Sequence, residues 1–489
     1  MNEWTERDLN WAQREGLALQ ELEEQIAIAS TQQPGAELVD PCRLDQGIEG
    51  QPRPIDMPLA PAVAARITHF IPASGAASRM FKAVVEARAQ GFTSEAHLAD
   101  AVATGATSLA PALEAVRGRR ALAVGQGIEH AELGEVLDHW LGTLTLPKQP
   151  KGLVPFHAYG PSARTAAEEQ VIEAAMMGDS AHVTVHFTVP EGTGARFEAA
   201  VDRVRPALAE LGRQVDLTTS VQHPVTNTVA LTPEGALFRL ADGTPLRRPG
   251  GHGALLRNLD ALDADLVVIK NIDNVVRDDH RDDVLRWRRG LVRRLLELEG
   301  EVHAHLRALE HGASGREALE FAERHFGTRP CPGLPRERAE FALRRPLRVC
   351  GMVRNEGQPG GGPFWVRGVD GSVTPQIVES AQVDLNNPAQ SNVFSRSTHF
   401  NPVDIVASLR DPDGVPYELP HFVDPTAWII AHKSFEGRPL RALERPGLWN
   451  GSMAGWNTLF VAIPAHVFQP VKQLADLLRT GHAPLAKER

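Results

Sequence analysis

The 489-residue sequence has few cysteines, no long apolar run and no excess of basic charge. Its three cysteines, Cys42, Cys331 and Cys350, lie far apart without a metal-ligand spacing, which excludes a cysteine-based zinc site and suits a reducing compartment. No apolar run approaches the roughly 20 residues of a membrane span, and the amino terminus is polar and acidic, unlike a signal peptide. A net charge of −10 and a pI near 6.0 argue against a general binder of nucleic acids or membrane surfaces. We therefore expect a cytoplasmic protein without a nucleic-acid or membrane partner.

Several common catalytic motifs are also missing. No Gly-Lys-Ser/Thr phosphate loop occurs, which disfavours a P-loop ATPase. Ser452 lies in Asn-Gly-Ser-Met-Ala, which lacks the two flanking glycines of a hydrolase nucleophile elbow. His182 with His186, and His303 with His305, could each bind a metal, but no third ligand at a suitable spacing accompanies either pair.

The pattern of apolar residues predicts a layered α/β protein. At this length the chain can bury a large core and hold about three domains of ordinary size. Thr5, with Asp8 three residues on, predicts the start of a helix over residues 6–30, and a Pro/Gly-rich linker follows over 33–61. The expected strands are 67–71, 181–189, 215–219, 228–231 and 266–269, and the expected helices include about 77–90 and 195–211. Strands separated by helices predict a mostly parallel, twisted sheet covered on both faces.

A glycine-rich stretch and the apolar run after it are the most informative part of the chain. Residues 248–259 read Arg-Pro-Gly-Gly-His-Gly-Ala-Leu-Leu-Arg-Asn-Leu, and residues 265–276 read Asp-Leu-Val-Val-Ile-Lys-Asn-Ile-Asp-Asn-Val-Val. Glycines let the main chain lie flat against a planar or anionic ligand. Asp273 would lie at the carboxyl end of a buried parallel strand, where open α/β sheets bind ligands. The alternatives are that Asp273 only caps a turn with Asn274 and that His252 is an ordinary loop histidine.

A second candidate loop lies between the first core strand and its helix. Residues 70–82 read Phe-Ile-Pro-Ala-Ser-Gly-Ala-Ala-Ser-Arg-Met-Phe-Lys, and Gly91 supplies a stop for the helix that follows. A helix N-terminus beside a glycine turn offers unpaired N–H groups to an anion, and Arg79 would add a fixed charge. The alternative is an ordinary strand-to-helix turn.

Two lysines lie in further recognisable segments. Residues 149–156 read Gln-Pro-Lys-Gly-Leu-Val-Pro-Phe around Lys151. Residues 467–478 read Val-Phe-Gln-Pro-Val-Lys-Gln-Leu-Ala-Asp-Leu-Leu around Lys472, which precedes an expected terminal amphipathic helix. In isolation Lys472 would be interpreted as a solvated charge.

Taken together and in this order, these segments resemble the nucleotide-sugar pyrophosphorylases, in particular the UTP-sugar-1-phosphate uridylyltransferases. Shorter similarities are Val221-Gln222-His223 and Ile377-Val-Glu-Ser380. Along nearly its whole length the chain also resembles an uncharacterised bacterial family, domain of unknown function 4301, through residues 351–356, 360–365 and 448–453.

The first resemblance implies which residues form the site. It assigns catalytic phosphate contacts to Arg79, Lys151 and Lys472, further substrate contacts to Ser74, Gly75, Ala76, Ser78, Gln222, Gly250, Gly251, His252, Gly253, Asn274 and Glu379, and Mg²⁺ binding to Asp273. Lys82 is the alternative to Lys151 for the phosphate contact. We prefer Lys151 because the residues around it match the family's motif. The segment 83–147 between them is either a helical insertion or a sign that the match is false. Ala77 in place of a glycine, and Ala254 where many relatives have an acidic residue, depart from the family pattern.

The resemblance also implies a fold and a division of the chain. We expect a three-layer α/β/α, Rossmann-like nucleotidyltransferase core with a mixed, mostly parallel sheet. Its parts would be an N-terminal helix and linker, the nucleotide-binding core, a helical insertion, and a β-rich sugar-side lobe with a C-terminal helix, over 1–62, 63–276, 277–345 and 346–489. Residues 83–147 would form a further helical insertion within the core.

The implied activity is Mg²⁺-dependent transfer of a nucleotidyl group from a nucleoside triphosphate, with UTP as the expected one, to a sugar 1-phosphate with release of pyrophosphate. One alternative is a nucleotide-sugar binding or regulatory protein on the same fold that has lost turnover, which Ala77 and Ala254 would suit. Another is transfer to a non-sugar phosphate acceptor.

Overall fold

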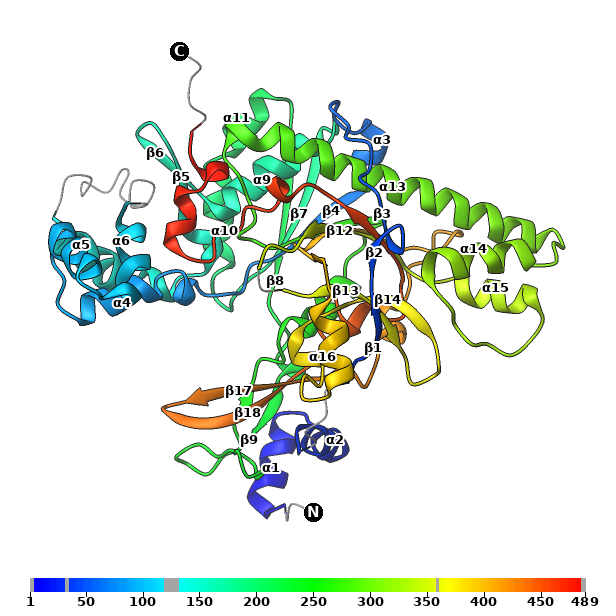
Figure 1. The fold of residues 1–489 in the computed structure, drawn as a ribbon, viewed down its shortest axis with the longest axis horizontal. Coiled ribbons are helices and arrows are strands. Elements are labelled where there is room, and N and C mark those ends of the chain that lie inside the picture. The colour runs from blue at the N-terminus through cyan, green and yellow to red at the C-terminus, as the bar shows by residue number, and fades with distance from the viewer. Residues whose placement is uncertain (1–3, 31–34, 118–131, 358–359, 485–489) are drawn as a thin grey trace. The chain divides into compact units, whose positions relative to one another are not determined.

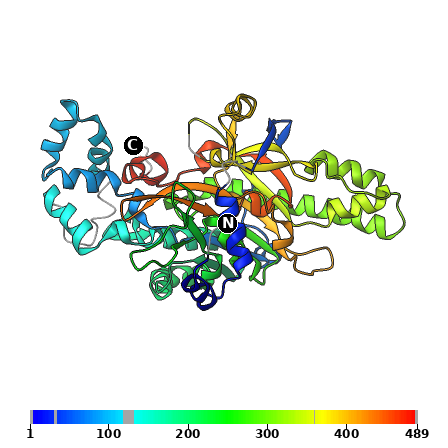
Figure 2. The same cartoon turned by 90° about the horizontal axis from the view of Figure 1, so that it is seen from below.

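The computed structural model describes residues 4–30, 35–117, 132–357 and 360–484 (Figures 1 and 2). The chain forms two compact units, each assembled from separated stretches of sequence. Unit 1 comprises residues 1–52, 222–266 and 291–463, and unit 2 comprises residues 53–221, 267–290 and 464–489. The division of the chain expected from its sequence stays a prediction.

A parallel sheet forms the centre of unit 2. Its strands follow the order β11, β4, β7 and β8, and β7 pairs in parallel with both β4 and β8. Their bounds are β4 Ile67–Pro72, β7 His182–Thr188, β8 Gln214–Ser220 and β11 Leu266–Lys270. β4 and β11 are buried along nearly their whole length, as strands covered on both faces should be. The helices that pack on β7 and β8 are α9 Ala166–Met177, α10 Gly194–Asp202 and α11 Arg205–Glu210.

Short helices follow β4 in unit 2. They are α4 Lys82–Ala89, α5 Glu95–Ala103, α6 Ala110–Arg117 and α8 Leu133–Asp138, with α3 Pro61–Ala64 before β4. Residues 118–131 of the expected insertion lie outside the described residues. Phe81, Leu98 and Trp140 join Phe187 and Phe197 in one apolar core, so these helices are packed against the sheet's own core. A hairpin of β5 Pro155–Tyr159 and β6 Ser162–Thr165 precedes α9.

Unit 1 contains a mixed sheet of order β2, β3, β19, β12 and β16. β3 pairs in parallel with β2 and β19, β12 pairs in parallel with β19, and β16 and β15 pair antiparallel with β12. The bounds are β2 Arg43–Leu44, β3 Gly47–Glu49, β12 Leu347–Arg354, β15 His399–Phe400, β16 Asp404–Ser408 and β19 Asn457–Ala462. Most pairs in the main sheets of both units are parallel. The expected α/β class with a mixed, mostly parallel sheet is therefore confirmed.

Two antiparallel sheets complete unit 1. One has the order β1, β13 and β14, with bounds Glu37–Pro41, Gly362–Arg367 and Val373–Val378. The other has the order β10, β9, β18 and β17, with bounds Arg247–Arg248, Thr228–Leu231, Arg438–Glu444 and Ile429–Phe435.

A long helix, α13 Asp278–Glu310, is followed by α14 Arg316–Phe326 and α15 Pro335–Leu343. Both views place α14 and α15 beside the C-terminal half of α13 (Figures 1 and 2). The rings of His305 on α13 and Phe321 on α14 lie 4.7 Å apart at this contact. A further helix, α16 Pro388–Ser395, lies in unit 1, and no described helix is both long and apolar enough to cross a membrane.

The expected single helix over 6–30 is wrong. The structure has α1 Glu6–Arg14 and α2 Leu19–Ser30, separated at Gly16, whose φ of 67° ends the first helix. The expected capping box is confirmed, because Thr5 and Asp8 exchange hydrogen bonds at the start of α1.

Other expected elements are shorter than the apolar pattern predicts. Over 77–90 the chain forms a 3₁₀ turn, Ala77–Arg79, before α4, and over 195–211 it breaks between α10 and α11, where Pro206 lies in the first turn of α11. The expected linker over 33–61 contains β1, β2 and β3, and the expected terminal helix is a 3₁₀ segment, Leu474–Leu478. In each case tertiary pairing or a proline overrides the local pattern.

Candidate functional site

In unit 2, segments far apart in the sequence meet beside the loop that follows β4. The amide of Ala77 donates to the carbonyl of Gln149 at 2.9 Å, and the amide of Lys151 donates to the carbonyl of Gly75 at 2.9 Å. The loop after β11 is joined to the C-terminal segment in the same way, since the amide of Val471 donates to the carbonyl of Asp273 at 3.0 Å. Residues 149–151 therefore pair with the loop that they were expected to follow, and the interpretation of residues 83–147 as a helical insertion stays a prediction.

Lys151 and Lys472 converge on one carboxylate, that of Asp273. The Nζ of Lys151 and the Nζ of Lys472 each lie 2.9 Å from Oδ2, and Lys472 Nζ also lies 3.2 Å from Oδ1. The side chains of Lys151 and Asp273 are 13% and 7% exposed, whereas that of Lys472 is 55% exposed. Burial alone would raise the pKa of Asp273, but the charges of Lys472 and Lys151 outweigh it and hold that pKa below its usual value. The cluster therefore carries a net positive charge.

The loop between Ser74 and Arg79 faces solvent. The amides of Ser74, Gly75 and Ala76 donate no hydrogen bond within the part of the chain that the structure describes. Ser78 and Arg79 are exposed, and Arg79 has no hydrogen bond or ion pair with any described residue. Free amides and a free guanidinium next to Lys151 are groups that an oxyanion would satisfy.

A divalent cation does not fit this arrangement. Both oxygens of Asp273 already accept from ammonium groups. Across residues 4–30, 35–117, 132–357 and 360–484, no group of three or more His, Cys, Asp or Glu side chains could hold a metal. Mg²⁺ prefers one or two carboxylates together with phosphate oxygens, and the carboxylate of Asp273 is already paired with two ammonium groups.

The segment that carries Asp273 is fixed from several sides. Gln170 of α9 donates its side-chain amide to the carbonyl of Asn271 at 2.9 Å. Farther along, the guanidinium of Arg277 donates to the carbonyl of Ala158 at 2.6 Å. These bonds hold the loop at both ends, which keeps its carboxylate in place between the two lysines.

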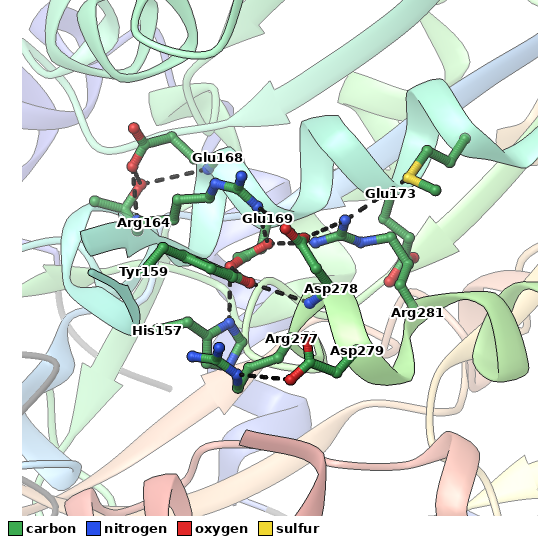
Figure 3. A network of polar contacts seen from close by, with 12 residues as sticks. His157, Tyr159, Arg164, Glu168, Glu169, Glu173, Arg277, Asp278, Asp279 and Arg281 are labelled. Carbon is green, nitrogen blue, oxygen red and sulfur yellow. Dashed lines mark hydrogen bonds and ion pairs between the residues drawn. The ribbon is translucent and has the colours of Figure 1, made fainter. Parts of the chain in front are cut away.

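A buried polar network lies behind this segment (Figure 3). Glu169 Oε1 accepts from the hydroxyl of Tyr159 at 2.9 Å and lies 2.8 Å from His157 Nδ1, while its Oε2 accepts from Arg281 at 2.6 Å. The other ring nitrogen of His157 lies 2.8 Å from Nδ1 of His482, which is buried. The network ties α9, α13 and the β5–β6 hairpin to the C-terminal segment.

The neighbouring His69 of β4 should make stability depend on pH. Burial lowers its pKa to about 4, with Lys270 and Arg288 adding to the shift and Glu173 opposing it. This folded pKa lies below the unfolded value of about 6.5, so the contribution of the neutral ring is complete above pH 6.5 and is lost as the pH falls toward 4. We expect this group to lower stability by about 2 kcal/mol at pH 5 relative to pH 8.

Urea unfolding of wild type and His69→Gln from pH 8 to pH 5 measures this contribution. The variant should lose that part of the pH dependence, and parallel curves for the two proteins would contradict the assignment.

In unit 1 the glycine stretch forms a tight turn into a helix, as expected. A 3₁₀ turn, His252–Leu255, leads into α12 Leu256–Asp260. Gly251 has a φ of 73°, and a Cβ on Gly253 would lie 2.0 Å from the carbonyl oxygen of Pro446. The turn is therefore possible only with glycine at these two positions.

The ring of His252 is oriented by its surroundings. The amide of Leu448 donates to its Nδ1 at 3.0 Å, so the proton of the neutral ring is on Nε2, which lies 3.9 Å from Glu379. The ring stacks on Trp449 with centroids 4.1 Å apart. Burial lowers the pKa of His252 to about 4 and raises the pKa of Glu379. The ring is thus neutral at physiological pH. Its two nitrogens face the amide of Leu448 and the carboxylate of Glu379.

The structure distributes the candidates over its two units. Ser74, Gly75, Ala76, Ser78, Arg79, Lys151, Asp273, Asn274 and Lys472 belong to unit 2, and Gln222, Gly250, Gly251, His252, Gly253 and Glu379 belong to unit 1. Asn274 accepts the amide of Gln469 at 3.0 Å, so its carbonyl oxygen is used within the fold. Gln222 donates to Asn227 at 3.2 Å. The competing Lys82 is 75% exposed and only faces Glu86 across one helical turn.

Sequence reasoning missed two residues that shape these clusters. Trp449 lies in segment 448–453, which served only for the family resemblance. An aromatic residue close to glycine and asparagine is a signal for a stacking surface. Gln170 gave no signal, because a glutamine in a helix has no distinctive pattern.

Comparison with solved structures finds similar chains among the UDP-glucose pyrophosphorylases. A mutant UDP-glucose pyrophosphorylase from Leishmania major in complex with UDP-glucose is 13% identical, with a TM-score of 0.47, over 96% of this chain and 77% of that one. Open and closed structures of the enzyme from that organism give 14% identity and a TM-score of 0.45 over 93% and 73%. A UDP-glucose phosphorylase from Trypanosoma brucei gives 12% and 0.39 over 88% and 70%.

Among proteins with curated descriptions, none matches this sequence. Residues 5–483 match a family described as a domain of unknown function, DUF4301. The match covers nearly the whole length and includes both the lysines around Asp273 and the glycine turn at His252. The chain therefore belongs to the DUF4301 family.

Proposed function

We propose that this protein is a nucleotidyltransferase that couples a nucleoside triphosphate, with UTP as the predicted one, to a sugar 1-phosphate and releases pyrophosphate. The observation that carries the proposal is the convergence of Lys151 and Lys472 on Asp273. Two lysines from distant segments meet beside an exposed loop with free amides and a free arginine. A polyphosphate is the substrate class that such a concentration of donors suits.

The proposed reaction is an exchange of phosphate bonds. An oxygen of the sugar 1-phosphate attacks the α-phosphorus, a new P–O bond forms, and the bond to the bridging oxygen breaks as pyrophosphate leaves with its electron pair. The attacking phosphate is already ionised at neutral pH, so the site needs no strong general base. Rate acceleration then depends on alignment and on neutralising charge in the transition state.

The described residues would divide this work. Arg79 and the amides of Ser74 to Ala76 would bind phosphate oxygens, and Lys151 would neutralise the group in transfer. Lys472, which is more exposed than Lys151, would reach the sugar phosphate. Taken within unit 1 alone, the neutral His252 ring on Trp449 is the surface that we predict for a base, and Glu379 lies beside it as an acceptor for hydroxyl groups.

Mg²⁺ remains the predicted cofactor of this chemistry. We assign no step to it at Asp273, because both lysines occupy that carboxylate. Chelation by EDTA during the assay tests the predicted requirement, and turnover that survives chelation would contradict it.

One observation favours a second function, the binding of a nucleotide sugar without turnover. A protein that must coordinate a catalytic metal needs a free carboxylate, and the predicted metal ligand Asp273 is paired with two lysines. A binding or regulatory protein would use the same lysines for phosphate recognition alone.

Pyrophosphate release distinguishes the two functions. Purified protein is incubated with Mg²⁺, each of the four nucleoside triphosphates and a pool of sugar 1-phosphates, beside Asp273→Ala and Asp273→Asn. A transferase releases pyrophosphate with one triphosphate and slows in both variants, because the lysines lose the group that positions them. No release, with nucleotide-sugar binding intact in all three proteins, would replace the transferase by the binding function.

A further inference from the structure

A cavity of about 820 Å³ lies within unit 1, next to the glycine turn. Gly253 and Ala254 form part of its wall, but His252, Trp449 and Glu379 do not line it. Its volume is in the range of pockets that hold small organic ligands, about 300–1,000 Å³. The cavity is therefore separate from the surface that we assign to the base.

Apolar residues form most of the cavity wall, and Trp428 contributes a flat ring to it. Val423, Pro425 and Trp428 line the cavity from one segment, and Pro446 lines it from another. The guanidinium of Arg445 lies 5.5 Å from the centre of the Trp428 ring. Trp428 is fixed in turn, because its indole N–H donates to the carbonyl of Pro425 at 3.0 Å. Such a surface favours a ligand with a flat apolar body.

Two of the charged groups in the wall pair with each other, and two do not form an ion pair. Arg445 and Glu21 satisfy each other at 3.1 Å, and Arg445 also donates to the carbonyl of Thr226 at 3.0 Å. Arg257 and Asp260 lie on α12, and neither forms an ion pair with the other or with any described residue. One oxygen of Asp260 accepts the amide of Leu419 at 2.9 Å, which leaves its second oxygen available.

The charges of the wall sum to zero, so a ligand with a net charge would leave one wall group unmatched. A ligand with both an anionic and a cationic group would pair with Arg257 and Asp260 together. We propose that this cavity is a second ligand site, for a small zwitterion with a flat aromatic body, of the chemical class of the aromatic amino acids. Its anionic group pairs with Arg257, its ammonium group pairs with Asp260, and its ring lies against Trp428.

Isothermal titration calorimetry with three probes tests this site. L-tryptophan carries both charges, tryptamine lacks the carboxylate, and indole-3-propionate lacks the amine. We expect L-tryptophan to bind with one site per chain, and each of the other two to bind about tenfold more weakly, as is usual for the loss of one charge-assisted hydrogen bond.

Two variants assign the charges to residues. Arg257→Ala should remove the advantage of L-tryptophan over tryptamine, and Asp260→Asn, which keeps the acceptor for Leu419, should remove its advantage over indole-3-propionate. Arg307→Ala is the matched control, since it removes one exposed arginine from α13 and should change nothing. The proposal is overturned if no probe binds, if the three bind equally, or if the α12 variants behave like Arg307→Ala. None of these probes is a nucleotide, so the result is independent of the proposed transferase activity.

Discussion

Replacing Lys151 by alanine should slow pyrophosphate release by about 10²- to 10³-fold, the loss typical of one preorganised charge at a reacting group. The fold should survive, because Asp273 keeps its contacts with Lys472 at 2.9 and 3.2 Å. The effect should therefore be on kcat rather than on the amount of folded protein. Steady-state rates of pyrophosphate release, together with a thermal unfolding scan, measure both.

Lys82→Ala is the matched control for this prediction. Lys82 was the rival candidate in the sequence, and its ammonium group is solvent exposed and lies 3.8 Å from Glu86. Its removal should change the rate by less than about twofold, since exposed pairs of this kind contribute at most about 1 kcal/mol. Equal losses in the two variants, or a loss only in Lys82→Ala, would show that the phosphate role belongs elsewhere.

The largest expected effect on stability comes from Glu173. Its carboxylate, 5% exposed, pairs with Lys270 and with Arg288, and the side chains of both partners are 2% exposed. Burial raises the pKa of Glu173, but Arg288 and Lys270 more than compensate and lower it to about 2. Glu173→Ala would remove the carboxylate that both buried cations contact, so we expect a loss of about 3–5 kcal/mol in the free energy of unfolding.

Urea unfolding of Glu173→Ala beside Glu297→Ala measures this effect. Glu297 pairs with Arg293 at 2.8 Å on the exposed side of α13, so its removal should cost less than about 1 kcal/mol. If the two variants lose similar free energies of unfolding, the contacts of Glu173 with Lys270 and Arg288 contribute no more than an exposed ion pair.

The strands and the candidate loops were predictable because their signals are local. The buried strand β11 reads as an apolar run, and the turn at Gly251 and Gly253 reads from the glycines that its geometry requires. The choice of Lys151 over Lys82 rested on its flanking residues, since segment 83–147 obscured the spacing to the loop after β4. Gly16 was a local signal too, and interpreting it as a helix stop would have separated α1 from α2.

The contacts that organise the site were not predictable, because they depend on side chains meeting across the fold. The sequence suggested Asp273 as a free carboxylate for Mg²⁺, whereas in the structure two lysines from separate segments occupy it. The ion pair between Glu169 and Arg281 in Figure 3 was not predictable either, because the two residues are 112 positions apart in the chain. Local patterns report periodicity and turns, and they carry no information on which buried charges become partners.

The reverse reaction tests the central claim most directly. Protein incubated with pyrophosphate, Mg²⁺ and a pool of nucleotide sugars is assayed for any nucleoside triphosphate formed, beside Lys151→Ala. The account predicts that wild type forms one triphosphate, which identifies the base, and that the variant forms it at least about a hundredfold more slowly. If wild type forms none while it still binds nucleotide sugars, the claim of nucleotidyl transfer is contradicted and the lysine cluster is a binding site alone.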